Sequence, residues 1–177
     1  MFNLDECERI DKIHGDSIWH HSRDKIEFFD CRSYEQLVGA KPRGVWMSFK
    51  KCDQDMSEWE LFCVSHKICI SSLKNKCQIA IYQPKDKPFI IIKNGFDCSL
   101  FQQKYGKYVT ECHPKIVYID WLKVSQDYSG IILYEDSPFS LYEYGFTKNS
   151  AGIGLKWLDK WSVYSGCIWH PELVKLI

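Results

Sequence analysis

Short apolar runs bounded by polar residues, glycine or proline recur along the chain, and each has the length of a single strand. Several are rich in valine, isoleucine and aromatic residues, which pack well on a pleated surface. The pattern therefore predicts strands over residues 17–22, 45–49, 78–83, 87–94, 129–135 and 165–170.

Other segments repeat their apolar residues every three or four positions, which is typical of a helix with one buried face. One such set runs from Ile26 to Leu37, and another follows an acidic first turn in the segment 53–66. The sequence predicts helices over 23–40, 53–66, 98–107 and 118–128, and either a helix or a loose arm over 1–16.

The predicted strands outnumber the helices and do not alternate regularly with them, which favours an α+β fold over a parallel βαβ sheet. The 177 residues fit a single domain, and no repeat or linker interrupts them. Four tryptophans fall in the last third of the chain: Trp121, Trp157, Trp161 and Trp169. We therefore expect one domain, residues 1–177, whose core is closed by the C-terminal segment.

Composition narrows the class of partner. Aromatic residues make up 15% of the chain, which suits a strand-rich core and also a pocket that stacks a planar ligand. The 23 basic and 23 acidic residues cancel, so the sequence lacks the overall positive charge typical of nucleic-acid-binding proteins. No apolar run reaches the roughly 20 residues needed to cross a bilayer.

The nine cysteines are scattered and odd in number, and the first residues lack the apolar core of a signal peptide. Both features favour reduced thiols and a cytoplasmic location. Cys63, His66 and Cys69 would share one helix face, but there is no CxxC pair and no evident fourth ligand, so we predict no metal site.

The adjacent histidines of "SIWHHSRD" are the first candidate site residues. Neighbours on a strand point to opposite faces, so only one of the two can face a given pocket. His20 shares a face with Ile18, and His21 shares a face with Trp19. The competing interpretation is a histidine at a strand end that bonds to a backbone carbonyl.

The stretch "KPRGVWMSF" is the second candidate. Lys41 and Arg43 lie on a turn that leads into a strand, where basic side chains can bind a phosphate or a carboxylate. Trp46 and Ser48 alternate along that strand and should share a face, so a ring could stack on Trp46 while Ser48 bonds an amide or a ribose. The alternative is a solvated turn.

The third candidate is a group of carboxylates after the strand at 129–135. Glu135 ends that strand and Glu143 follows in the next loop. A carboxylate at such a place can orient a hydroxyl or stabilise a developing positive charge at the edge of a pocket. The alternative is a capped, solvated loop.

Together, "WHHS", "KPRGVWMS", "IDWLKVSQDYSGIIL" and "SGCIW" resemble a group of bacterial and viral proteins that carry variants of Y-H-F-S, K-P-x-G-L-W-x-S, D-Y-D-G-I and W-D-x-x-S-G-C-I-W. Their order also resembles the ADP-ribosyltransferase fold. That resemblance implies two small, mostly antiparallel sheets that form a central cleft, with helices at the periphery and NAD bound in the cleft.

The resemblance also implies roles for particular residues. His20 matches a first-strand histidine that bonds the ribose next to the nicotinamide, and Ser48 matches a second-strand serine. The acid that such proteins carry inside a later strand is replaced here by Ile132, so Glu135 or Glu143 would have to act instead.

The same resemblance places four further residues in the NAD site: Trp19, His21, Arg43 and Trp46. Arg43 would contact phosphate, and the aromatic residues would line the nicotinamide. The implied activity is transfer of ADP-ribose from NAD to a protein, a nucleic acid or a small molecule. The alternative function is a non-enzymatic module, of viral or bacterial origin, that binds a partner protein and retains only a degenerate cleft.

Overall fold

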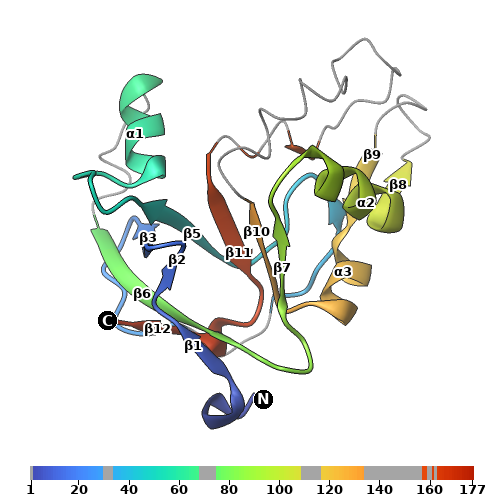
Figure 1. The fold of residues 1–177 in the computed structure, drawn as a ribbon, viewed down its shortest axis with the longest axis horizontal. Coiled ribbons are helices and arrows are strands. Elements are labelled where there is room, and N and C mark those ends of the chain that lie inside the picture. The colour runs from blue at the N-terminus through green and yellow to red at the C-terminus, as the bar shows by residue number, and fades with distance from the viewer. Residues whose placement is uncertain are drawn as a thin grey trace.

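The computed structural model describes residues 2–29, 34–67, 75–108, 117–133, 157–158, 161 and 163–177. Its main feature is one curled sheet of nine strands that forms a half-barrel (Figure 1). The strands are β1 (Glu8–Ile10), β2 (Lys12–Ile13), β3 (Asp16–Ser22), β5 (Val45–Lys50), β6 (Asn75–Gln83), β7 (Phe89–Ile92), β10 (Gly130–Leu133), β11 (Ser165–Ile168) and β12 (Val174–Leu176).

The order across this sheet is β1-β6-β3-β5-β11-β10-β7, with β2 beside β3 and β12 beside β6. Its pairs are antiparallel except for β7 and β10, which run parallel. The long strand β6 pairs with β3 through its first residues and with β1 and β12 through its last. β6 therefore joins the strands on either side of it along its length.

A second, small sheet has three strands in the order β4-β9-β8: β4 (Val38–Gly39), β8 (Gly106–Tyr108) and β9 (Val117–Asp120). Among the described residues, the α-helices are α1 (Glu58–Ser65), α2 (Gly95–Tyr105) and α3 (Trp121–Asp127), and short 3₁₀ turns cover Leu4–Glu6 and Pro171–Leu173. In Figure 1, α1 stands near β3 and β5, whereas α2, α3 and the small sheet lie on the other side, beside β7 and β10.

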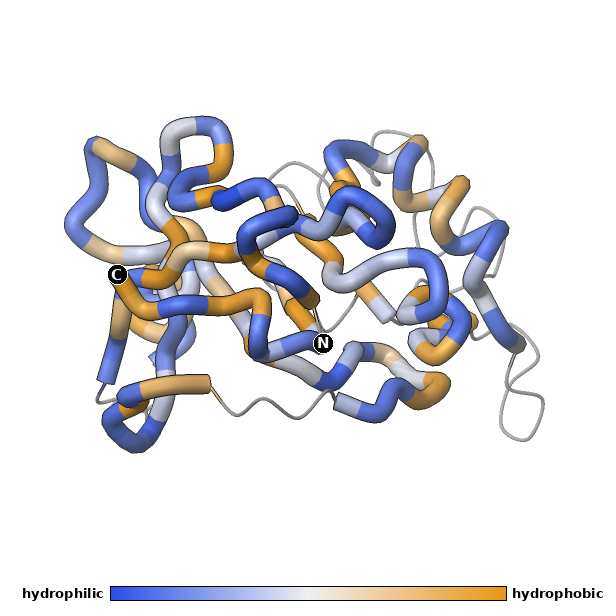
Figure 2. Tube along the Cα trace, turned by 90° about the horizontal axis from the view of Figure 1, so that it is seen from below, coloured by the Kyte–Doolittle hydropathy of each residue, from blue (hydrophilic) through white to orange (hydrophobic). Residues whose placement is uncertain are grey.

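Both faces of the large sheet are covered, as the alternation along β5 shows. Val45, Met47 and Phe49 join one buried cluster with residues of β6 and β12, whereas Trp46 packs against a second cluster. That second cluster combines β10 and β11 with α2, α3 and the tryptophans of the C-terminal third. Figure 2 shows short hydrophobic and hydrophilic stretches that follow one another along the tube.

The α+β class is confirmed, but the large sheet has nine strands where small sheets are expected from the resemblance. The strands predicted at 17–22, 45–49, 78–83, 87–94, 129–135 and 165–170 are present as β3, β5, β6, β7, β10 and β11. The expectation that the C-terminal segment closes the core is also confirmed. β11 lies between β5 and β10, and the indoles of Trp157 and Trp169 are almost completely buried.

The helix predicted over 23–40 is wrong. Residues 23–29 and 34–37 follow an irregular path, and 38–39 form β4. Leu37 is 48% exposed, so the apolar spacing does not mark a buried helix face. Gln36 is buried instead, and its side-chain amide bonds the backbone N–H and carbonyl of Arg43.

The expectations for residues 1–16 are also wrong, because the described residues there form a 3₁₀ turn and the strands β1 and β2. The other three predicted helices are present as α1, α2 and α3, but their boundaries differ from the predicted ones. The segment 118–128 begins as β9 and becomes helical only at Trp121, after Asp120 caps the first turn. The helix predicted over 53–66 starts at Glu58, where Ser57 and Glu60 form a capping box.

Gly44 explains how the turn after Pro42 enters the large sheet. A Cβ atom at this position would overlap the backbone carbonyl of Ile168 and the Sγ atom of Cys167. Only glycine therefore lets the chain approach β11 this closely just before β5 begins. None of the helices in the described ranges is long and apolar enough to span a bilayer.

Candidate functional site

A cavity of about 280 Å³ opens on the face of β5 that carries Trp46 and Ser48. Its wall combines three indoles, four other polar or basic side chains and two apolar residues. The lining residues are His21, Lys41, Trp46, Met47, Ser48, Trp59, Trp161, Val163 and Ser165. Aromatic walls with a few convergent polar groups are typical of sites for small organic ligands.

The strand register brings the polar residues of the cavity together. Ser48 on β5 is the direct partner of Trp19 on β3 and of Ser165 on β11. Partners in an antiparallel pair share a face, and so do residues two apart along one strand. Trp19, His21, Ser48 and Ser165 therefore start on one face of the sheet, although they come from three strands.

The first turn of α1 closes one side of the cavity. Ser57 caps the helix, and the Glu60 carboxylate accepts a bond of 2.9 Å from the Ser57 N–H. The backbone N–H of Trp59 donates to Oγ of Ser48 at 2.9 Å. This bond fixes the start of α1 above β5 and makes the Trp59 indole a wall of the cavity.

The other indoles form a second wall. The ring centroids of Trp46 and Trp161 lie 4.8 Å apart at an angle of 54°, and Trp161 is only 3% exposed. Phe62 stacks on Trp59 with a centroid distance of 5.5 Å. Packed indoles of this kind give the cavity a rigid shape, which favours flat ligands.

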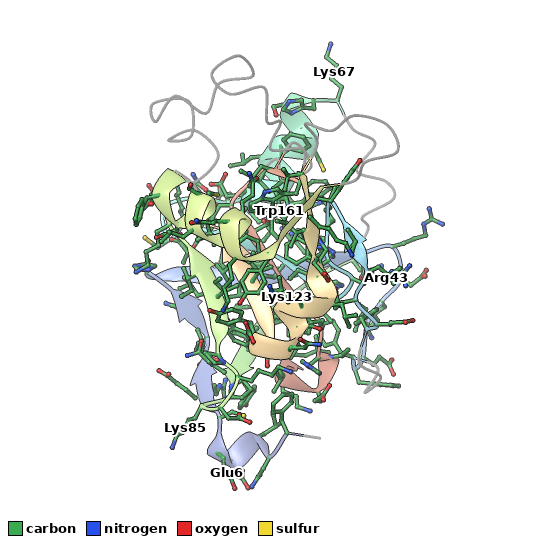
Figure 3. All side chains as sticks on the ribbon, turned by 90° about the vertical axis from the view of Figure 1, so that its right-hand side faces the viewer. Glu6, Arg43, Lys67, Lys85, Lys123 and Trp161 are labelled. Carbon is green, nitrogen blue, oxygen red and sulfur yellow. The ribbon has the colours of Figure 1, made fainter. Side chains whose placement is uncertain are left out.

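Lys41 is the basic residue of the predicted turn that reaches the cavity. Its Nζ atom lies 4.5 Å from the centroid of the Trp46 ring, in a cation–π contact. Arg43 is exposed, and its side chain extends away from the body of the protein, whereas Trp161 lies within it (Figure 3). Of these two basic residues, the lysine is therefore placed to contact an anionic group of a ligand in the cavity.

His21 lines the cavity, and one nitrogen of its ring is hydrogen-bonded to Ser57. Its Nε2 atom lies 2.9 Å from Oγ of Ser57, which already accepts the N–H of Glu60. The hydrogen bond between Nε2 and Oγ runs in the direction that the tautomer of the ring sets, and Nδ1 is the ring nitrogen on the other side from Ser57. Burial lowers the pKa of His21 and outweighs the opposing attraction of Glu60.

His20 lies outside the set of lining residues. The β3–β5 ladder ends at the pair Trp19 and Ser48, and Nδ1 of His20 donates instead to the Trp46 carbonyl at 2.7 Å. Its ring meets the edge of Phe29 at 5.3 Å, and burial lowers its pKa. The alternative prediction, a strand-end histidine bonded to a carbonyl, is confirmed for His20.

Trp19 lies beside the cavity rather than in its wall. The indole Nε1 atom donates to Oγ of Ser17 at 2.8 Å, and the Nζ atoms of Lys50 and Lys76 lie 5.7 and 5.6 Å from its ring. These contacts hold the indole over the end of the sheet. Its predicted place in a nucleotide site remains a prediction.

The two predicted acids, Glu135 and Glu143, lie outside the described residues. No carboxylate is found among the lining residues that the structure describes. Within the same ranges, no three His, Cys, Asp or Glu side chains come close enough together to hold a metal ion. The acidic group that transfer chemistry needs therefore rests on the sequence prediction alone.

The sequence analysis did not identify Trp59, Trp161, Val163 and Ser165 as site residues. A local signal existed for Trp59, because the sequence Ser57-x-x-Glu60 is a capping box that fixes where the helix starts. Ser165 joins the site because β11 pairs with β5, and Trp161 and Val163 come from the segment just before β11. A comparison of the chain with protein-family models, curated proteins and solved structures finds no match.

Proposed function

We propose that this chain is an NAD-binding domain of the ADP-ribosyltransferase type, with the nicotinamide ring of NAD in the cavity on β5. The observation that carries the proposal is the convergence of Trp46 and Ser48, both expected from the resemblance, with His21 and two further indoles in one cavity. The cavity is built on β3, β5 and β11 of the large sheet and on α1, and in this proposal it takes the place of the cleft that the resemblance implies between two sheets.

The size of the cavity limits what it can enclose. Ligand pockets usually measure roughly 300–1,000 Å³, so about 280 Å³ accommodates one ring and part of a sugar rather than a whole dinucleotide. The rest of NAD then lies outside, where Lys41 attracts the diphosphate. A point charge on a flexible stem suits this contact, because the phosphates need no fixed geometry.

Of the two histidines, we assign the ribose contact to His21. His20 is held by the Trp46 carbonyl, whereas His21 lines the cavity and bonds Ser57 through Nε2, so its Nδ1 is the nitrogen that would bond a ribose hydroxyl. In the transfer step, the bond between ribose C1 and the nicotinamide nitrogen breaks and its electron pair leaves with nicotinamide. An acceptor oxygen or nitrogen bonds to the same carbon and gives its proton to a base, for which Glu135 and Glu143 are the candidates.

Calorimetric titration with NAD tests the binding step. We expect binding to wild type and a loss of at least tenfold in affinity for Trp59→Ala and for His21→Ala. Phe96→Ala is the matched control, because Phe96 is a 63% exposed aromatic residue on α2, away from the cavity wall. Release of nicotinamide by wild type, and its loss in Glu135→Gln or Glu143→Gln, tests the transfer step.

One observation favours the alternative, a non-enzymatic protein-interaction module. Three apolar side chains on or just before α1 remain substantially exposed: Met56 at 41%, Leu61 at 38% and Val64 at 51%. Exposed apolar residues grouped on one helix are a common feature of surfaces that bind partner proteins. Absence of NAD binding to the folded wild-type protein would make this alternative the leading function.

A further inference from the structure

Ser48 and Ser165 form a pair of hydroxyl groups in the cavity wall. They are direct partners in the β5–β11 ladder, and both line the cavity while being 3% and 8% exposed. Directly opposite residues of an antiparallel pair have Cβ atoms about 4.5–5.5 Å apart. Two atoms of one small polar group on a ligand can therefore reach the two hydroxyls together.

The bonds that each serine already makes give the two hydroxyls opposite polarity. Oγ of Ser48 accepts a hydrogen bond of 2.9 Å from the backbone N–H of Trp59, so the hydroxyl hydrogen of Ser48 remains available to donate. Oγ of Ser165 donates to the Val163 carbonyl at 2.8 Å, so its lone pairs remain available to accept. The cavity thus presents a donor on β5 beside an acceptor on β11.

We infer that the Ser48–Ser165 pair recognises a primary carboxamide, and that it selects the nicotinamide form of the ligand. The inference rests on the proposed function and extends it to the part of NAD that the site reads. The carbonyl oxygen of the amide accepts from Ser48, and its NH₂ group donates to Ser165. An aromatic ring that bears the amide then lies between the indole walls of the cavity.

Selectivity follows because a group without an N–H leaves the lone pairs of Ser165, a residue that is 8% exposed, without a partner on the ligand. An acetyl group keeps the carbonyl and replaces NH₂ by a methyl of similar size. A buried polar group that loses its partner lowers affinity by about tenfold or more. The site should therefore reject the acetyl analogue although it fits sterically.

The test compares NAD with its 3-acetylpyridine analogue, two dinucleotides that differ only in this group. Binding to the full chain is followed by calorimetry, with quenching of tryptophan fluorescence as a second readout. We expect wild type to bind NAD about tenfold more tightly than the analogue. This comparison needs no substitution, so it does not depend on any variant folding.

Three variants then assign the preference to particular atoms. Ser165→Ala should weaken NAD binding and leave the analogue unchanged, so that the two affinities become equal. Ser48→Ala should weaken both ligands by a similar factor, because both carry the carbonyl. Ser125→Ala is the matched control, since Ser125 is a partly exposed serine of α3, outside the cavity wall, whose hydroxyl donates to the Leu122 carbonyl in its own helix turn.

Equal affinity of wild type for NAD and the analogue would overturn the inference and leave the proposed NAD site intact. A preference for NAD that survives in a folded Ser165→Ala protein, checked by circular dichroism, would also overturn it. If neither dinucleotide binds to folded wild type, the proposed function fails and this inference fails with it. The three outcomes are therefore distinguishable.

Discussion

The backbone N–H of Trp59 donates a hydrogen bond of 2.9 Å to Oγ of Ser48, and this contact joins the first turn of α1 to the centre of the large sheet. The position of the Trp59 indole, which forms one wall of the cavity, therefore depends on Ser48. Because Ser57 also bonds His21, α1 is attached to the sheet at two adjacent points of the cavity. The geometry of the site and the stability of α1 are therefore linked.

This link predicts that Ser57→Ala destabilises the protein by about 1–2 kcal/mol, because the substitution removes the N-cap of α1 and the partner of His21. Ser65→Ala is the control, since Ser65 lies exposed near the other end of the same helix and bonds only neighbouring residues. Chemical denaturation measures both. Equal stability of the two variants would show that the cap and the His21 contact contribute little.

Lys41→Gln should lower the affinity for NAD several-fold and reduce the dependence of binding on salt, because a contact between ammonium and phosphate is screened by ions. Lys85→Gln is the control, because Lys85 lies far from Trp161 at the other end of the molecule (Figure 3). Titrations at two salt concentrations provide the measurement. A larger loss with Arg43→Gln than with Lys41→Gln would return the phosphate contact to the residue that the sequence suggested.

The pKa of His21 is lowered by burial, and this predicts a pH dependence of stability. A histidine whose folded pKa lies below its unfolded value favours the folded state fully above about pH 6.5, and this contribution is lost as the pH falls. We expect the midpoint of thermal unfolding to fall from pH 7 to pH 5, and to fall less in His21→Gln. An identical decrease in both proteins would assign the effect to other groups.

Trp169→Ala should destabilise the protein by about 3–5 kcal/mol, because it empties the space of an almost fully buried indole and removes its bond to the Tyr128 carbonyl. Trp169→Phe retains part of the packing and should be less severe. Urea denaturation followed by circular dichroism compares the two. Similar stability of both variants would mean that the bond to Tyr128 matters more than the packing.

The features that the sequence determined by itself are those set by residues close together in the chain. The apolar run of β5 and the alternation of Trp46 with Ser48 follow from the two-residue period of a strand. The sequence also indicated a helix within residues 53–66, but its start at Glu58, after the cap formed by Ser57 and Glu60, was not predicted. Such signals need no distant residue, because they depend on backbone geometry and on side chains a few positions apart.

Tertiary structure decided the rest. Apolar spacing between residues 23 and 37 indicated a helix, but no buried surface is available to cover Leu37, and Gln36 takes the buried position instead. The sequence showed that His20 and His21 point in opposite directions, and only the placement of α1 decided that His21 reaches the cavity. Ser165 joins Ser48 through strand pairing over more than a hundred residues, which no local pattern encodes.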